Sequence, residues 1–155
     1  MNPDPDYSAA YVIIETDQSS IKGHSFAFTL GRGNELCCEA IKALQHLVIG
    51  LDVNWIRDNQ STFSRRMTSD SQLRWVGTEK GIIQMASGAI INAVWDILAK
   101  LENKPLWQLV SEMNSDQISN AIDFRHITDF LSKDEAVEIL KSHENTKFNR
   151  KTILE

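Results

Sequence analysis

The chain has 155 residues, 42% of them hydrophobic and 24% charged, with a formal net charge of -5, which is typical of a soluble globular domain. A TIM barrel needs roughly 200–250 residues of its own, so a chain of this length cannot contain one. Basic residues are scattered except for Arg65-Arg66 and the cluster Lys147, Arg150 and Lys151. Nucleic acid is therefore not an expected partner.

A membrane partner is not expected either, since no run approaches the roughly 18 consecutive apolar residues of a spanning segment. The start MNPDPD resembles neither a signal peptide nor a transit peptide. The compartment therefore stays unknown. Cys37 and Cys38 are adjacent in a predicted helix, where their side chains diverge, so we expect reduced, buried thiols.

Residues 9–30 predict a β-hairpin. Residues 11–15 are β-branched and apolar, residues 17–20 are typical of a turn, and the following run alternates with Phe26 and Phe28 on one face. An isolated hairpin is only marginally stable in water, so it needs a third strand or a layer of helices.

Helices are predicted next. Asn34 is a good N-cap for a helix over residues 35–48, in which Leu36, Ala40, Leu44 and Leu47 have helical spacing. Residues 51–58 predict another short helix, and residues 63–75 a mixture of helix and loop.

The longest predicted helix starts near Thr78 or Glu79 and ends before Pro105. Apolar residues cover most of its circumference, which is typical of a central helix. Its small residues Ser87, Gly88, Ala89 and Ala93 allow another backbone to approach closely. Asp96 and Lys100 have the i, i+4 spacing of a surface ion pair.

Beyond Pro105, residues 118–127 predict one buried strand. Ser132 and Glu135 form a capping-box pattern that opens a last helix from Lys133 to about Ser142.

The sequence lacks the common motifs for nucleotide binding, zinc binding and nucleophilic catalysis. It has no phosphate loop and no complete dinucleotide fingerprint, its four histidines are widely separated, and no Gly-x-Ser-x-Gly places a nucleophile. Tyr7 follows the turn Asp4-Pro5-Asp6, which could hold its hydroxyl at the lip of a site. The alternative is an ordinary loop tyrosine.

Five ordered blocks carry a resemblance to a known family: DPDYSAAYVIIETD, IKGHSFAFTLGRGNE, SDSQLRWVGTEKG, AVWDILAKLENKPLWQL and IDFRHITD. Together they resemble the L-fuconate dehydratases of the enolase superfamily. The stretch MASGAIINAVWDILAKLENKPLWQLV is similar to the helix signature of the mandelate racemase and muconate lactonizing group of that superfamily.

The resemblance implies an α+β capping domain, a hairpin followed by a helical bundle, over residues 1–117. Residues 118–155 would then begin a truncated barrel domain, with residues 122–127 as its first strand. The family's first cap strand would lie before Met1. Two family loops that shape the substrate pocket match residues 1–8 and 30–34, and Tyr7 matches a tyrosine that contacts the sugar acid.

The family's chemistry needs a lysine or histidine base and a Mg²⁺ ion held by three acidic residues. None of the residues present matches that base or those ligands, and Asp123 is the sole carboxylate on the predicted barrel strand. The chain is thus expected to have no catalytic residue and no metal or cofactor site of its own. The parent would be a Mg²⁺-dependent acid-sugar dehydratase, in the mitochondrion or cytosol.

The expected partners are the acid sugar, the missing barrel domain and a second copy of the chain through exposed apolar surface. The alternative function is a stand-alone, non-catalytic interaction module or splice form whose capping fold binds another protein.

Overall fold

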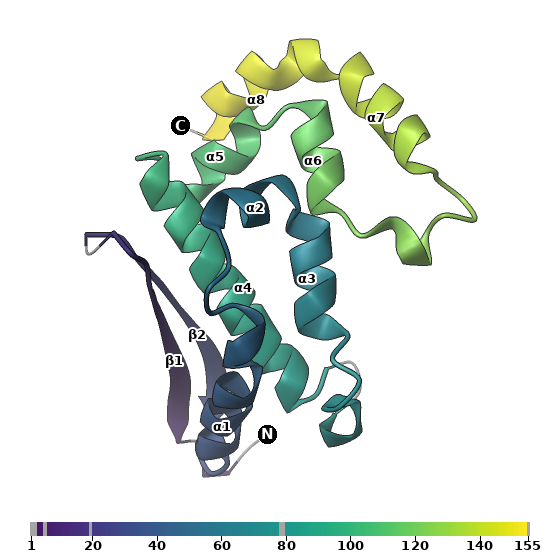
Figure 1. Cartoon of the computed structure of the whole chain (residues 1–155). Helices are drawn as coiled ribbons and strands as arrows, with labels where there is room; N and C mark the ends of the chain where they lie inside the picture. The colour runs from purple at the N-terminus through teal and green to yellow at the C-terminus, as the bar shows by residue number, and fades with distance from the viewer. Residues whose placement is uncertain (1–2, 5, 19, 78–79, 155) are drawn as a thin grey trace.

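The structure is a computed structural model that describes residues 3–4, 6–18, 20–77 and 80–154. Strands β1 (Tyr7–Glu15) and β2 (Lys22–Leu30) form an antiparallel hairpin in which Tyr7 lies opposite Leu30 and Glu15 opposite Lys22. The predicted hairpin is therefore confirmed. It lies at one side of the molecule, and the helices lie on one of its two faces (Figure 1).

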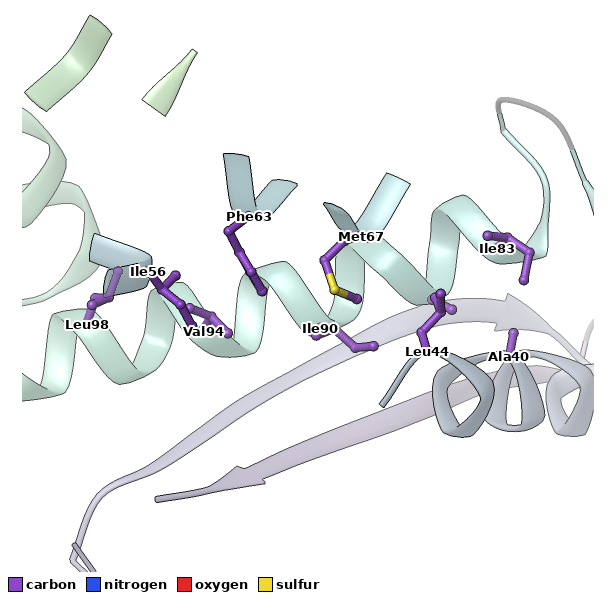
Figure 2. Packing of buried hydrophobic residues seen from close by; sticks show 10 residues of the cluster. Ala40, Leu44, Ile56, Phe63, Met67, Ile83, Ile90, Val94 and Leu98 are labelled. Atoms are coloured by element: carbon purple, nitrogen blue, oxygen red, sulfur yellow. The ribbon is translucent and has the colours of Figure 1, made fainter. Parts of the chain in front are cut away.

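Helix α4 (Ile82–Leu101) is the centre of the fold, as its apolar circumference predicted. Phe63 and Met67 pack on it from one direction and Leu44 from another (Figure 2). The buried Ser87 hydroxyl donates a 3.0 Å hydrogen bond to the Met67 carbonyl. Helix α4 is long and apolar enough to cross a membrane by length and composition alone. Core helices of globular proteins often meet the same criterion, and 56% of the most apolar window of α4 is buried inside the protein.

The hairpin lies on α1 (Asn34–Leu44) and α4 through small side chains. A buried cluster joins the inner face of the hairpin to both helices and consists of Ala10, Val12, Ala27, Cys37, Ala89 and Ala93. Small residues on both surfaces let the backbones approach closely.

β2 and α4 approach each other closely at Gly23. A Cβ added there would lie 2.1 Å from the Ala93 carbonyl oxygen, so the site admits only glycine. Two polar contacts join the same elements: the His24 amide donates to Asp96 Oδ2 (2.8 Å), and Lys100 Nζ donates to the Lys22 carbonyl (2.7 Å). Asp96 and Lys100 also form the predicted ion pair, with Nζ 2.5 Å from Oδ2, so the pair blunts one edge of the sheet.

The expected start of α1 is corrected. Helix α1 begins at Asn34 itself, with Gly33 as its N-cap and no side-chain cap, because the Asn34 amide is used elsewhere. The long helix begins at Ile82, and the start expected at Thr78 or Glu79 lies outside the described residues.

Between α1 and α4 the chain forms η1 (Gln45–Leu47), α2 (Val53–Asp58), α3 (Gln60–Thr68) and η2 (Arg74–Val76). The Asp52 side chain caps α2 by accepting a hydrogen bond from the Asn54 amide (2.7 Å). The short helix predicted over residues 51–58 is thus confirmed, as is the mixture of helix and loop that follows it.

The C-terminal region is helical: α5 (Leu106–Glu112), α6 (Ser115–Ala121), η3 (Phe124–His126), α7 (Lys133–Ser142), η4 (Glu144–Thr146) and α8 (Lys147–Leu154). These elements form an arc at the end of α4 away from α1 (Figure 1). The capping box of α7 is confirmed, since Ser132 and Glu135 exchange hydrogen bonds.

The buried strand predicted over residues 118–127, including the barrel strand 122–127, is wrong. A capping box of Asn114 and Gln117 starts α6, which takes up the first part of this run. The Asp123 side chain then accepts a hydrogen bond from the Arg125 amide and opens η3. In the described residues β1 pairs only with β2, so no neighbouring strand satisfies an extended backbone here, and local hydrogen bonds do so instead.

An added methyl group should change the free energy of unfolding in opposite directions at Gly23 and at Gly88. Gly23→Ala should lower the free energy of unfolding by about 2–3 kcal/mol, because its Cβ meets backbone that must move. Gly88→Ala should raise it by about 0.5–1 kcal/mol, because α4 has open space there. Urea unfolding of both variants tests this, and equal effects would contradict the close contact.

Candidate functional site

One end of the hairpin brings together the two segments expected to shape a pocket. Tyr7 is the first residue of β1 and lies opposite Leu30, the last residue of β2. Gly31 follows with φ of 87°, and a Cβ there would lie 3.1 Å from Asp6 Cβ. The backbone before Tyr7 therefore packs on the loop after Leu30, although Met1, Asn2 and Pro5 lie outside the described residues.

Tyr7 faces solvent. Its side chain is 72% exposed, and its ring packs on Phe28 with the centroids 5.8 Å apart and the planes at 31°. Within the described part of the chain its hydroxyl has no hydrogen-bond partner, so it is available to a ligand.

Asn34 fixes the loop at the same end. Its Oδ1 accepts from the Thr29 hydroxyl (2.7 Å), and its Nδ2 donates to the Ala9 carbonyl (3.3 Å). Gly33 adopts φ of 98°, so the loop is held by two left-handed glycines and one amide. Arg32 is an exposed residue of this loop, between Gly31 and Gly33, and it was not among the candidates predicted from the sequence. Its position between two glycines was the signal that could have identified it.

Among the described residues no group of three or more histidine, cysteine or acidic side chains lies close enough to hold a metal ion. The described residues therefore do not supply the cluster of carboxylate oxygens that Mg²⁺ needs. Both cysteines are free, Cys37 buried and Cys38 half-buried, and burial raises the pKa of the Cys37 thiol.

Asp123, the single carboxylate expected on a barrel strand, has a structural role. It pairs with Arg65 of α3, Nη2 to Oδ1 at 2.5 Å, and with Arg125, Nε to Oδ2 at 2.9 Å. The Arg125 guanidinium also donates to the Ser69 hydroxyl (3.0 Å). The hydrogen bond from Arg65 lowers the pKa of Asp123 to about 2. The cluster ties η3 to α3, and both carboxylate oxygens are already occupied.

A hollow of about 910 Å³ lies at the other end of the hairpin, against α2 and α4. Its walls are mainly aliphatic, including Ile14, Val94 and Ile97. Cations at its rim are already paired: Lys42 with Glu39 at 2.6 Å and Arg57 with Glu102 at 3.6 Å. It offers an apolar surface and lies away from Tyr7.

Comparison with known proteins identifies the family. Residues 6–111 match the family model of the mandelate racemase / muconate lactonizing enzyme, N-terminal domain. The chain belongs to this family. That assignment confirms the predicted α+β capping domain of the enolase superfamily.

Relatives of known name are similar over nearly the whole chain. Mitochondrial enolase superfamily member 1 of Xenopus laevis is 52% identical over 92% of this chain, and the Homo sapiens protein of that name is 48% identical over 97%. The L-galactonate dehydratase of Hypocrea jecorina is 45% identical over 97%.

A crystal structure of the human relative superposes with a TM-score of 0.89 at 47% identity, over 97% of this chain and 34% of that one. The chain spans about one third of the length of these relatives, from 32% to 34%. The match supports an enolase-superfamily, dehydratase-like protein, and the family generally uses Mg²⁺.

The Arg65–Asp123 pair predicts a pH-dependent stability. Because the folded pKa of Asp123 is about 2, below its ordinary value of 3.8, the pair stabilises the fold above about pH 4 and its contribution is lost as the pH falls through 2. Asp123→Asn should lower the melting temperature by roughly 2–4 °C at pH 7. The difference from wild type should shrink as the pH approaches 2.

Thermal melts followed by circular dichroism between pH 7 and pH 2 provide the measurement. Asp129→Asn removes an exposed carboxylate from the same loop and is the matched control. If the two variants behave alike at every pH, the pair does not stabilise the fold.

Proposed function

We propose that this chain is the capping domain of an acid-sugar dehydratase and that its Tyr7 end forms part of the substrate-pocket wall. The observation that carries the proposal is the packing of Asp6 on Gly31 next to the exposed Tyr7, which lies opposite Leu30 at one end of the hairpin. Membership of the capping-domain family and the likeness to an L-galactonate dehydratase support the substrate class.

The proposed reaction would remove the proton α to a carboxylate and expel water from the neighbouring carbon, and a Mg²⁺ ion held by residues of the barrel would supply stabilisation of the developing negative charge. The barrel of the complete protein supplies the base and the metal ligands. The residues of this chain bind and orient the sugar acid: the Tyr7 hydroxyl offers a hydrogen bond, the Arg32 guanidinium offers a charge for a carboxylate, and the Phe28 ring limits access of water.

On this proposal residues 1–155 alone turn over no acid sugar. Electrostatic stabilisation of the developing charge is commonly the largest catalytic contribution, and its donors lie in the barrel. A stand-alone interaction module is the second candidate, which the exposed apolar side of the hairpin favours.

The test uses a full-length relative whose capping segment is replaced by this sequence. Tyr7→Phe should lower kcat/KM for L-fuconate or L-galactonate by roughly tenfold, because a hydrogen bond to a ligand is worth about 1–1.5 kcal/mol. Tyr11→Phe is the matched control, because that hydroxyl lies 3.2 Å from His24 Nδ1 within the hairpin. A keto-acid assay measures turnover.

The proposal predicts activity in the chimera, loss in Tyr7→Phe, near-normal turnover in Tyr11→Phe, and none from residues 1–155 alone. Unchanged kinetics with a lower melting temperature in Tyr7→Phe would make Tyr7 a packing residue. Turnover by the isolated chain above a buffer control would contradict the proposal that the barrel holds all of the catalytic residues.

A further inference from the structure

The residues that follow β2 form a tight β-turn. The backbone amide of Asn34 donates a hydrogen bond to the Gly31 carbonyl (3.3 Å), which closes the turn over residues 31–34. Gly33 has φ of 98° and ψ of 0°, close to the values of about +80° and 0° at the third position of a type II turn. Arg32 therefore occupies the second position, at the corner of the turn, and its side chain is exposed there.

The side chain of Asn34 attaches this turn to both strands. Its Oδ1 accepts a hydrogen bond from the Thr29 hydroxyl of β2 (2.7 Å), and its Nδ2 donates to the Ala9 carbonyl of β1 (3.3 Å). Asn34 is also the first residue of α1. Because Ala9 follows Tyr7 closely on β1, a short path of hydrogen bonds and backbone joins Tyr7 to Arg32.

The Arg32 side chain is available to an anion. Among the described residues the ion pairs involve other cations and leave the Arg32 guanidinium unpaired. A guanidinium presents a planar fork of N–H donors that matches a carboxylate. A turn that is ordered before the ligand arrives avoids most of the entropy cost of fixing a loop upon binding. The order of the turn should therefore contribute to affinity.

We propose that Asn34 is a positioning residue, which acts through Arg32 by holding the turn in the one arrangement where Arg32 and Tyr7 contact the same ligand. The inference rests on the proposed function, in which both residues bind the sugar acid. Asn34 itself touches no substrate. Its two side-chain hydrogen bonds set the place of the turn relative to β1, and loss of either bond lets the turn move away from Tyr7.

This role differs from a purely structural one in its kinetic effect. A ligand contact away from the reacting atoms is made in the ground state and in the transition state alike, so its loss raises KM and leaves kcat unchanged. A purely structural defect reduces the folded fraction of the enzyme, which lowers the measured kcat and leaves KM unchanged.

The test uses the chimera in which this sequence replaces the capping segment of a full-length relative, with L-galactonate as the substrate. Asn34→Ala should raise KM by about fivefold or more and keep kcat within about twofold of wild type. Thr29→Val should raise KM about threefold, because it removes one of the two hydrogen bonds at similar side-chain volume. Thr29→Ser keeps the hydroxyl and should retain the wild-type KM.

A double-mutant cycle tests whether Asn34 acts through Arg32. In an Arg32→Ala background, Asn34→Ala should change KM by less than about twofold, because no guanidinium remains to be positioned. Independent roles would give the same ratio of KM values with and without Arg32.

Thr16→Val is the matched control. The Thr16 hydroxyl makes comparable hydrogen bonds at the opposite end of the hairpin, to the Gln18 and Ile21 carbonyls (both 2.9 Å). Its loss should lower the melting temperature and leave KM unchanged.

Residues 1–155 provide a second readout that needs no turnover. The ¹⁵N order parameter of the Arg32 amide should be about 0.85 in the wild type, as in rigid backbone, and should fall below about 0.6 in Asn34→Ala.

Three results would overturn this inference alone: a normal KM in Asn34→Ala and Thr29→Val, the same effect of Asn34→Ala with and without Arg32, or an Arg32 order parameter that Asn34→Ala does not change. Loss of activity in Tyr7→Phe would then still support the proposed function. A chimera without turnover, or one in which Tyr7→Phe and Arg32→Ala both react normally, would overturn the proposed function and this inference with it.

Discussion

The approach of β2 to α4 at Gly23 determines how the rest of the chain is arranged. A side chain at that position would overlap the Ala93 carbonyl, so the strand can lie on the helix only because both surfaces are small. The Asp96–Lys100 pair then takes up the His24 amide and the Lys22 carbonyl. This ion pair therefore also satisfies the hydrogen-bonding groups of β2 that point away from β1.

This contact has consequences at both faces of the hairpin and at one of its ends. The inner face carries mainly small and aliphatic residues, and the aromatic side chains Tyr11, Phe26 and Phe28 lie on the face turned away from the helices. At one end, the fixed strand register sets Tyr7 opposite Leu30 and brings Asp6 onto Gly31. The candidate binding wall therefore depends on contacts well away from it, along the length of β2 and α4.

Local patterns in the sequence predicted the elements whose residues show a regular apolar spacing or a capping motif. The hairpin, α4 and the capping box of α7 all follow from periodicity or capping chemistry. The predicted strand over residues 118–127 failed because a run such as Ile122 to Ile127 is extended only when neighbouring strands pair with it. The close contact of α4 was expected from its small residues, but Gly88 has open space and Ala93 is the residue in contact.

The candidate site was less accessible to sequence reasoning. The role expected of Tyr7 came from a family resemblance, since a tyrosine after a turn is common. Arg65 and Asp123 are 58 positions apart, and no spacing rule links them. Asn34 was predicted as a helix cap from its type, yet its amide joins two strands instead. Such contacts join residues that are distant in the sequence, so no short sequence pattern predicts them.

Amide hydrogen exchange most directly tests whether α4 covers the edge of β2. Ile13 and His24 lie opposite each other in the hairpin, and the His24 amide donates to Asp96 and not to β1. In an antiparallel pair of this kind, both backbone amides point away from the partner strand. The account predicts that the His24 amide exchanges as slowly as the amides of Ala93 and Val94 in α4, and that Asp96→Ala removes this protection. The Ile13 amide, on the open edge of β1, should exchange much faster. Equal exchange of the His24 and Ile13 amides in the wild-type chain would contradict the account.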